Sequence, residues 1–65
     1  MDKVQISKLR LNRIIHGLSL TQLAYKSGIP ASTLSLTERK FRQPTKDEIE
    51  RLASTLEVAV EDLKE

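Results

Sequence analysis

The residues of this chain best suited to binding a ligand are small hydroxyl side chains, which a group of cations closely follows. Ser32 and Ser35 lie in the stretch 31–39, and Lys or Arg occupies positions 39, 40, 42 and 46. Hydroxyl groups donate to and accept from the edges of nucleic-acid bases, whereas Lys and Arg neutralise phosphates. This combination predicts a surface that binds a polyanion.

The distribution of charge along the chain supports the same interpretation. The net charge is only +2, but residues 1–46 contain nine Lys or Arg and two acidic residues, whereas residues 47–65 contain two basic and seven acidic residues. The two parts therefore carry net charges of +7 and −5. Such a split predicts a domain with one positive side that meets a polyanion. A dipolar surface that contacts only solvent is the alternative.

Residue types for catalysis or metal binding are scarce. The chain has no Cys, and its single histidine, His16, suits the C-terminus of a predicted helix better than it suits acid–base catalysis. No Gly-rich loop could hold a nucleotide. We therefore expect no enzyme activity, no cofactor, no metal site and no small-molecule ligand.

Features of membrane insertion or export are also missing from the sequence. No apolar run approaches the ~20 residues of a membrane span. The polar start at residues 1–3 differs from the apolar stretch of a signal peptide. We expect a cytoplasmic protein without membrane contact.

The periodicity of apolar residues predicts one all-α domain, residues 1–65, built from five helices. The expected helices are 4–17, 20–27, 31–39, 46–56 and 60–64. Ser19 and Thr45 are expected N-caps, and Gly28 is expected to end the second helix in a left-handed turn. The first helix is expected to bury one apolar stripe formed by Ile6, Leu9, Leu11, Ile14 and Ile15.

The second and third predicted helices form a helix-turn-helix. Each is too short to bury its apolar side alone, so the break at Gly28-Ile29-Pro30 must fold both onto a shared core. One polar face of the third helix then stays exposed. A helix fits the major groove of DNA, where short side chains at its N-terminal end can read bases. The candidates for base reading are Ala31, Ser32, Ser35 and Leu36.

From about Ile6 to Leu63 the chain resembles the lambda-repressor-like, Cro/C1-type (XRE) helix-turn-helix domains of phage repressors and small bacterial regulators. The matching residues are Gly17-Leu18-Ser19, Leu23-Ala24, Gly28-Ile29, Ser32-Thr33-Leu34-Ser35, Glu38-Arg39, Pro44-Thr45, Leu56-Glu57-Val58 and Glu61-Asp62-Leu63. The resemblance implies a compact five-helix bundle. It further implies a bacterial or phage-encoded transcriptional regulator that binds specific sequences of double-stranded DNA. Such regulators most often act as repressors.

Candidates for contacts to DNA phosphates surround the predicted reading helix. Free N–H groups at the starts of the second and third helices suit phosphates, and cations supply affinity. The direction of the Thr33 side chain is left open, because it faces either the DNA backbone or the second helix. The full set is Ser19, Gln22, Thr33, Arg39, Lys40, Arg42 and Lys46.

Three apolar residues depart from the pattern of the family. Leu20 stands where many members carry glutamine, and Ala31 and Leu36 occupy places that face the groove. They could touch thymine methyl groups, or they could form an apolar patch for a protein partner. The second reading makes the domain a protein-interaction module.

The remaining expectations concern structure and assembly. The resemblance implies an ion pair between Arg13 and Glu38. Thr37 falls at an aliphatic core position of the family, and Lys40 falls at a helix-ending glycine. Tyr25 is expected to be partly packed and Phe41 to fill the loop after the third helix. A homodimer is expected to form through Val58, Val60 and Leu63, with Val60 exposed in the monomer.

Overall fold

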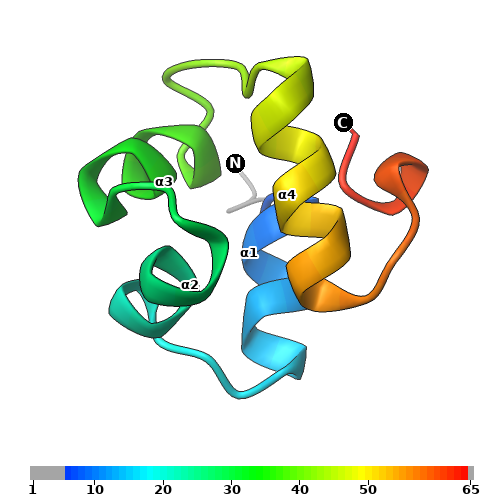
Figure 1. The fold of residues 1–65 in the computed structure, drawn as a ribbon. Coiled ribbons are helices and arrows are strands. Elements are labelled where there is room, and N and C mark those ends of the chain that lie inside the picture. Colours follow the sequence, from blue (N-terminus) through cyan, green and yellow to red (C-terminus); the bar gives the residue numbers. More distant parts are fainter. Residues whose placement is uncertain (1–5, 65) are drawn as a thin grey trace, which may run out of the picture.

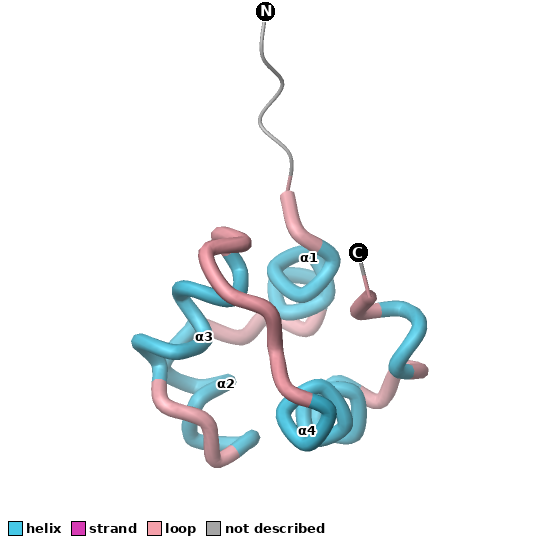
Figure 2. Tube along the Cα trace, turned by 90° about the horizontal axis from the view of Figure 1, so that it is seen from above, coloured by secondary structure: helices cyan, strands magenta, loops and turns pink. Residues whose placement is uncertain are grey.

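The fold is a bundle of short helices with a tight turn at its C-terminal side (Figure 1). The structure is a computed structural model that describes residues 6–64. The helices are α1 (Lys8–Ile15), α2 (Leu20–Ser27), α3 (Ala31–Glu38) and α4 (Lys46–Leu56), followed by the 3₁₀ turn η1 (Val60–Asp62). In the view from above, α1 and α4 lie on opposite sides, α2 and α3 form one flank, and η1 lies on the other flank (Figure 2). The described residues contain no strand, as the predicted all-α class requires.

The C-terminal segment differs from the prediction, because four α-helices are present and the fifth is replaced by η1. The N–H groups of Asp62 and Leu63 donate to the carbonyls of Ala59 and Val60, three residues back, each at 2.9 Å. Bonds of this spacing define a 3₁₀ turn. The carboxylate of Asp62 also accepts from the N–H of Ala59 at 3.3 Å, which holds the segment as a single tight turn.

Local side-chain caps set the starts of α2 and α4. Ser19 Oγ accepts from the N–H of Gln22 at 3.0 Å, and Gln22 Oε1 accepts from the N–H of Ser19 at 2.8 Å. Thr45 and Glu48 form the same reciprocal pair at the start of α4. These capping boxes each satisfy two backbone donors that the helix itself leaves without partners.

The ends of α1 and α3 differ in detail from the prediction. The expected start of the first helix at Val4 lies outside the described residues, and α1 begins after Ser7, whose hydroxyl accepts from the N–H of Arg10. The C-cap of α3 is Arg39, and Lys40 follows with a left-handed backbone, φ +64°. The N–H groups of Lys40 and Phe41 donate to Thr37 and Leu36, so α3 ends in a Schellman motif without glycine.

The core draws most on α4, which supplies three buried apolar residues against one from each other helix, and α1 contributes less than expected. Leu9 is the only buried apolar residue of α1, whereas Leu11, Ile14 and Ile15 are 46%, 49% and 68% exposed. The predicted apolar stripe of the first helix is therefore wrong, because at 100° per residue these three positions lie on the side opposite Leu9. Ile6, just before α1, is also exposed. The buried apolar residues are Leu9, Leu23, Ile29, Leu34, Leu52, Ala53, Leu56 and Leu63.

Candidate nucleic-acid interface

The turn between α2 and α3 fixes the direction of α3. Gly28 takes φ +75° at the end of α2, and Ile29 buries its side chain in the hydrophobic core. Ser27 is buried, and its hydroxyl accepts from the N–H of Ile29 at 3.3 Å. With Leu23 and Leu34 fully buried, α3 can turn only its opposite side to solvent.

One side of α3 carries the candidate base-reading residues. Ser32 and Leu36 are exposed, Ser35 is half-buried, and Arg39 follows at the helix end. Residues spaced by three, four and seven positions share one face of a helix. Ala31 is half-buried at the first position of α3. Of the four candidates, the structure thus exposes Ser32 and Leu36 and leaves Ala31 and Ser35 half-buried.

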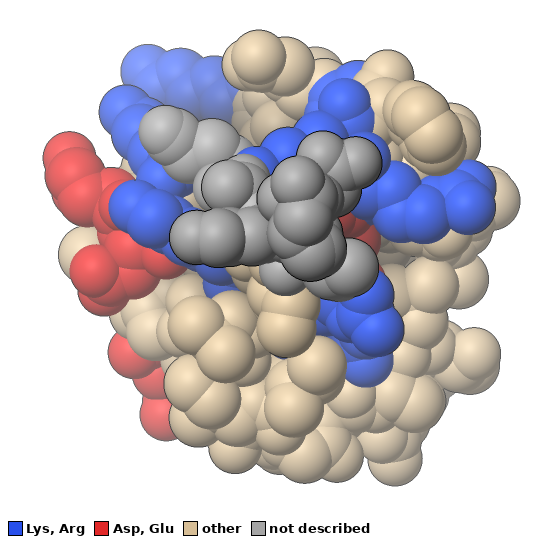
Figure 3. All heavy atoms as spheres, turned by 180° about the vertical axis from the view of Figure 1, so that it is seen from behind, with Lys and Arg blue, Asp and Glu red and all other residues tan. Residues whose placement is uncertain are grey.

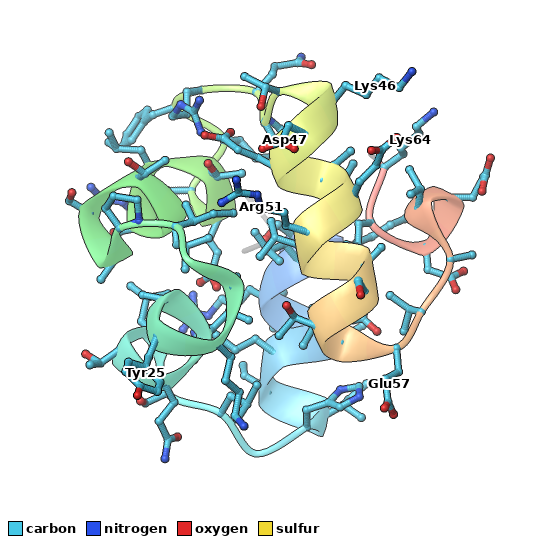
Figure 4. All side chains as sticks on the ribbon, in the orientation of Figure 1. Tyr25, Lys46, Asp47, Arg51, Glu57 and Lys64 are labelled. Carbon is cyan, nitrogen blue, oxygen red and sulfur yellow. The ribbon has the colours of Figure 1, made fainter. Side chains whose placement is uncertain are left out.

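Two exposed cations, Arg39 and Lys40, directly follow α3. Lys46 lies at the start of α4, where its side chain points away from α3, on the side of Lys64 (Figure 4). The guanidinium of Arg39 lies 5.1 Å from the centre of the Phe41 ring. Phe41 is 71% exposed, so it stacks with Arg39 at the surface and does not fill the loop as predicted.

The N-terminus of α2 presents polar groups beside the same surface. Ser19 and Gln22 are exposed but engage each other in the capping box. The pair uses Oε1 of Gln22, so its amide nitrogen remains outside the pair. Thr33 is half-buried, and its carbonyl accepts from Thr37 Oγ1 at 2.9 Å. Leu20 is half-buried and packs against the core, which reduces the apolar surface it was expected to offer.

Arg42 has a different position from the one expected of a phosphate contact. Its Nη1 donates to Thr37 Oγ1 and to Glu48 Oε1, both at 2.9 Å, and its side chain is 30% exposed. The bonds tie the loop 39–45 to both α3 and α4. The N–H of Thr45 and the guanidinium of Arg42 hold the pKa of Glu48 below its ordinary value.

The hydrogen bonds of Thr37 explain why this buried position of α3 tolerates a polar residue. The residue is buried, but its hydroxyl donates to the carbonyl of Thr33 and accepts from Arg42. A buried hydroxyl with both partners avoids the cost of an unsatisfied polar group. The sequence could not show this bridge, since it depends on where the loop 39–45 lies relative to α3.

Arg13 and Glu38 form a nearly buried ion pair that joins α1 to α3. Arg13 Nε donates to Glu38 Oε2 at 2.7 Å, and Nη2 donates to Oε1 at 3.2 Å. Nη1 of Arg13 donates to the carbonyl of Leu18 at 2.9 Å. The two side chains are 14% and 6% exposed. The carboxylate of Glu38 is therefore directed inward, away from the exposed face of α3.

A comparison with protein families shows which family this chain belongs to. The family model described as Helix-turn-helix matches residues 6–63, almost the whole chain. The chain belongs to the Cro/C1-type helix-turn-helix family. Members of this family are DNA-binding regulatory domains and are not typically enzymes. The comparisons with curated proteins and with solved structures gave no match.

The burial of three residues in this helix-turn-helix domain differs from the prediction. Tyr25 is 91% exposed on α2, where Figure 4 shows it at the outer surface, so it is not packed as expected. Leu63 is only 5% exposed and belongs to the core, so it has almost no surface left for a partner. Val60 was expected to be exposed, but it is half-buried and packs against the core with Val58.

Two further properties of the helix-turn-helix domain concern metals and membranes. Within residues 6–64, no group of three or more His, Cys, Asp or Glu side chains is placed to hold a metal ion. No helix among those described has the length and apolar character needed to cross a bilayer.

Proposed function

We propose that this protein is a transcriptional regulator that binds specific sequences of double-stranded DNA and acts mainly as a repressor, by blocking access of polymerase. The observation that carries the proposal is the exposed side of α3, with Ser32 and Leu36, followed at the helix end by the exposed cation Arg39. As a bacterial or phage-encoded regulator, it would act in the cytoplasm.

The proposed complex places α3 in the major groove. Ser32 and Ser35 would contact base edges through their hydroxyl groups, and Ala31 and Leu36 would contact thymine methyl groups. These contacts would define the sequence preference, because the major groove distinguishes all four base pairs.

The surrounding groups would hold the phosphates on either side of the groove. Ser19 and Gln22 lie at the N-terminus of α2, where the helix dipole favours an anion; their own N–H groups are engaged in the capping box, so the side chains would make the contact. Arg39 and Lys40 supply positive charge at the C-terminal end of α3, and Lys46 supplies it at the start of α4. Such contacts give affinity and register but carry no sequence information.

Arg42 and Thr33 have supporting roles in this proposal. Since Arg42 already binds Thr37 and Glu48, it is better suited to positioning the loop 39–45 than to neutralising a phosphate. Thr33 is half-buried, and its carbonyl is engaged by Thr37, so its hydroxyl is at most a minor phosphate contact.

A gel-shift assay on random duplex at low salt, followed by a salt titration, tests the proposal. Binding should weaken with salt at a slope of about −0.9 per neutralised phosphate, or roughly −7 for a dimer with four contacts in each subunit. Lys46→Gln should reduce the slope by about one per subunit on every sequence. Lys26→Gln is the matched control, because exposed Lys26 lines a surface shared with Asp47 and Glu50.

Sequence specificity needs a second measurement. Fragments selected from a random DNA pool should share a motif with two-fold symmetry, and Ser32→Ala or Leu36→Ala should alter that motif. Failure to bind any duplex at low salt would overturn the proposal. That result would favour the protein-interaction module, for which the 39% exposed Leu36 is the best remaining apolar contact near Ala31 and Leu20.

A further inference from the structure

A partly open groove lies beside the N-terminal part of α4. Its volume is about 800 Å³, within the range of about 300–1,000 Å³ that is usual for small-molecule sites. Its walls come from α1, the end of α3, the loop 39–45, α4 and the segment 60–64. Because these segments lie far apart in the chain, the groove could not be predicted from the sequence.

The turn η1 is too short to cover the whole length of α4. The eleven residues of α4 extend over about 16 Å, whereas the three residues of η1 extend over about 6 Å. The turn packs against α4, but the residues of α4 that line the groove all lie within 46–52. This N-terminal part of α4 therefore keeps an accessible side.

The floor of the groove is apolar. Leu9, Leu52 and Leu63 are almost completely buried beneath it. Ile49 and Val60 are half-buried, so they retain the apolar surface that a ligand would contact. None of the described residues that line the groove is aromatic, so a nucleotide base would have no ring to stack on. The floor therefore suits an aliphatic chain.

The rim of the groove is positively charged. Four of the lining residues are basic, and only one, Glu50, is acidic. Arg42 is already engaged by its own hydrogen bonds. Lys46 and Lys64 are exposed, and neither forms an ion pair within residues 6–64. These two lysines are therefore the best placed to bind an anion.

The figures show where this positive charge lies. Lys46 and Lys64 extend to the same side of the molecule, beside the start of α4 (Figure 4). From behind, basic side chains gather in the upper part of the molecule, and acidic side chains lie along one edge (Figure 3). An anion held between the two lysines would offset their mutual repulsion.

We propose that this groove binds a small amphiphilic carboxylate, with its aliphatic chain on Ile49 and Val60 and its carboxylate between Lys46 and Lys64. The charge of the rim favours an anion over a neutral ligand. The volume favours a free small molecule over a helix of a partner protein, and the concave floor fits a single chain better than the surface of a bilayer. Binding requires no DNA, so its test is independent of the proposed function.

Titration of the intact protein with sodium octanoate tests the proposal. In nitrogen–proton NMR spectra at low salt and below the micelle concentration of octanoate, amide signals of the loop 39–45 and of residues 46–52 and 60–64 should shift together. The dissociation constant should be about 1 mM or lower, as expected for a well-fitting ligand of about ten non-hydrogen atoms. The melting temperature should rise with octanoate concentration.

Related probes separate the apolar floor from the charged rim. A fully buried methylene group tightens binding about fourfold, so octanoate should bind at least about threefold more tightly than hexanoate in this partly open groove. Octylammonium has the same chain with the opposite charge, so its binding should be at least about tenfold weaker. The affinity for octanoate should also fall as salt rises.

Substitution of the two lysines tests their role. Lys64→Gln should weaken octanoate binding at least about threefold, and the combination with Lys46→Gln should weaken it further. Lys26→Gln is the matched control, because Lys26 is also exposed but lines a different surface, so its replacement should leave octanoate binding unchanged. Lys64 is not among the proposed phosphate contacts, so Lys64→Gln should leave DNA binding unchanged.

Three results would overturn the inference. One is a set of shifts confined to Leu11, Ile14 and Ile15, which would place octanoate on the exposed apolar side of α1. Another is equal affinity for hexanoate and octanoate, which would exclude the apolar floor. The third is a double lysine variant that binds octanoate as tightly as the original protein.

Discussion

Removal of the Glu38 carboxylate should destabilise the protein more than any single change at its surface. The carboxylate is 6% exposed and accepts two bonds from Arg13, at 2.7 and 3.2 Å. Glu38→Ala would leave the Nε and Nη2 donors of a largely buried guanidinium without that partner. Breaking a buried pair in this way costs about 3–5 kcal/mol.

The size of the domain makes this loss easy to measure. A chain of this length has a total stability of roughly 3–10 kcal/mol. Each kcal/mol changes the melting temperature of so small a domain by about 4–8 °C. Glu38→Ala should therefore lower the melting temperature by at least about 12 °C, or unfold the protein outright, as followed by circular dichroism.

Two controls separate burial from charge. Asp47 pairs with Arg51 at 3.0 Å, but both side chains are more than half exposed, so Asp47→Ala should cost less than about 1 kcal/mol. Replacing both buried partners, Arg13→Met with Glu38→Leu, should recover most of the lost stability, because no charge is then left unpaired. A melting temperature of Glu38→Ala within about 2 °C of the original would refute the argument.

Three further changes act on the helix ends and on the loop 39–45. Lys40→Gly should raise the melting temperature, because it relieves about 1 kcal/mol of left-handed strain at φ +64°; a calorimetric melt measures this. Thr45→Ala should cost about 1 kcal/mol in urea unfolding, through loss of the α4 cap. Because the pKa of Glu48 is lowered in the folded state, its contribution is present above the ordinary value of 4.5 and is lost as pH falls below it. Urea unfolding as a function of pH should thus show a smaller loss of stability in acid for Glu48→Gln than for the original.

The sequence predicted those features that depend on near neighbours. Ser19 and Thr45 are caps because each has a partner three residues later, and Gly28 can take a left-handed backbone that other residues avoid. The helix-turn-helix followed from the same local signals. The pairing of Arg13 with Glu38 required knowledge of the family, because nothing local relates two residues that lie 25 positions apart.

The features that the sequence did not predict depend on packing between elements. Spacing alone showed an apolar first helix but could not show that only Leu9 faces the core. The partners of Arg42 lie in α3 and α4, so its role was visible only once both helices were placed. The same holds for Tyr25, whose exposure depends on where α2 packs.

The bridge from Arg42 to Thr37 and Glu48 affects the entropy cost of DNA binding. Ordering a flexible backbone costs about 1–2 kcal/mol of conformational entropy per residue. Because Arg42 already bonds the middle of the loop 39–45 to α3 and α4, much of that loss occurs during folding and not when a duplex is bound. The surface that includes this loop is thus preorganised by hydrogen bonds that lie within residues 37–48.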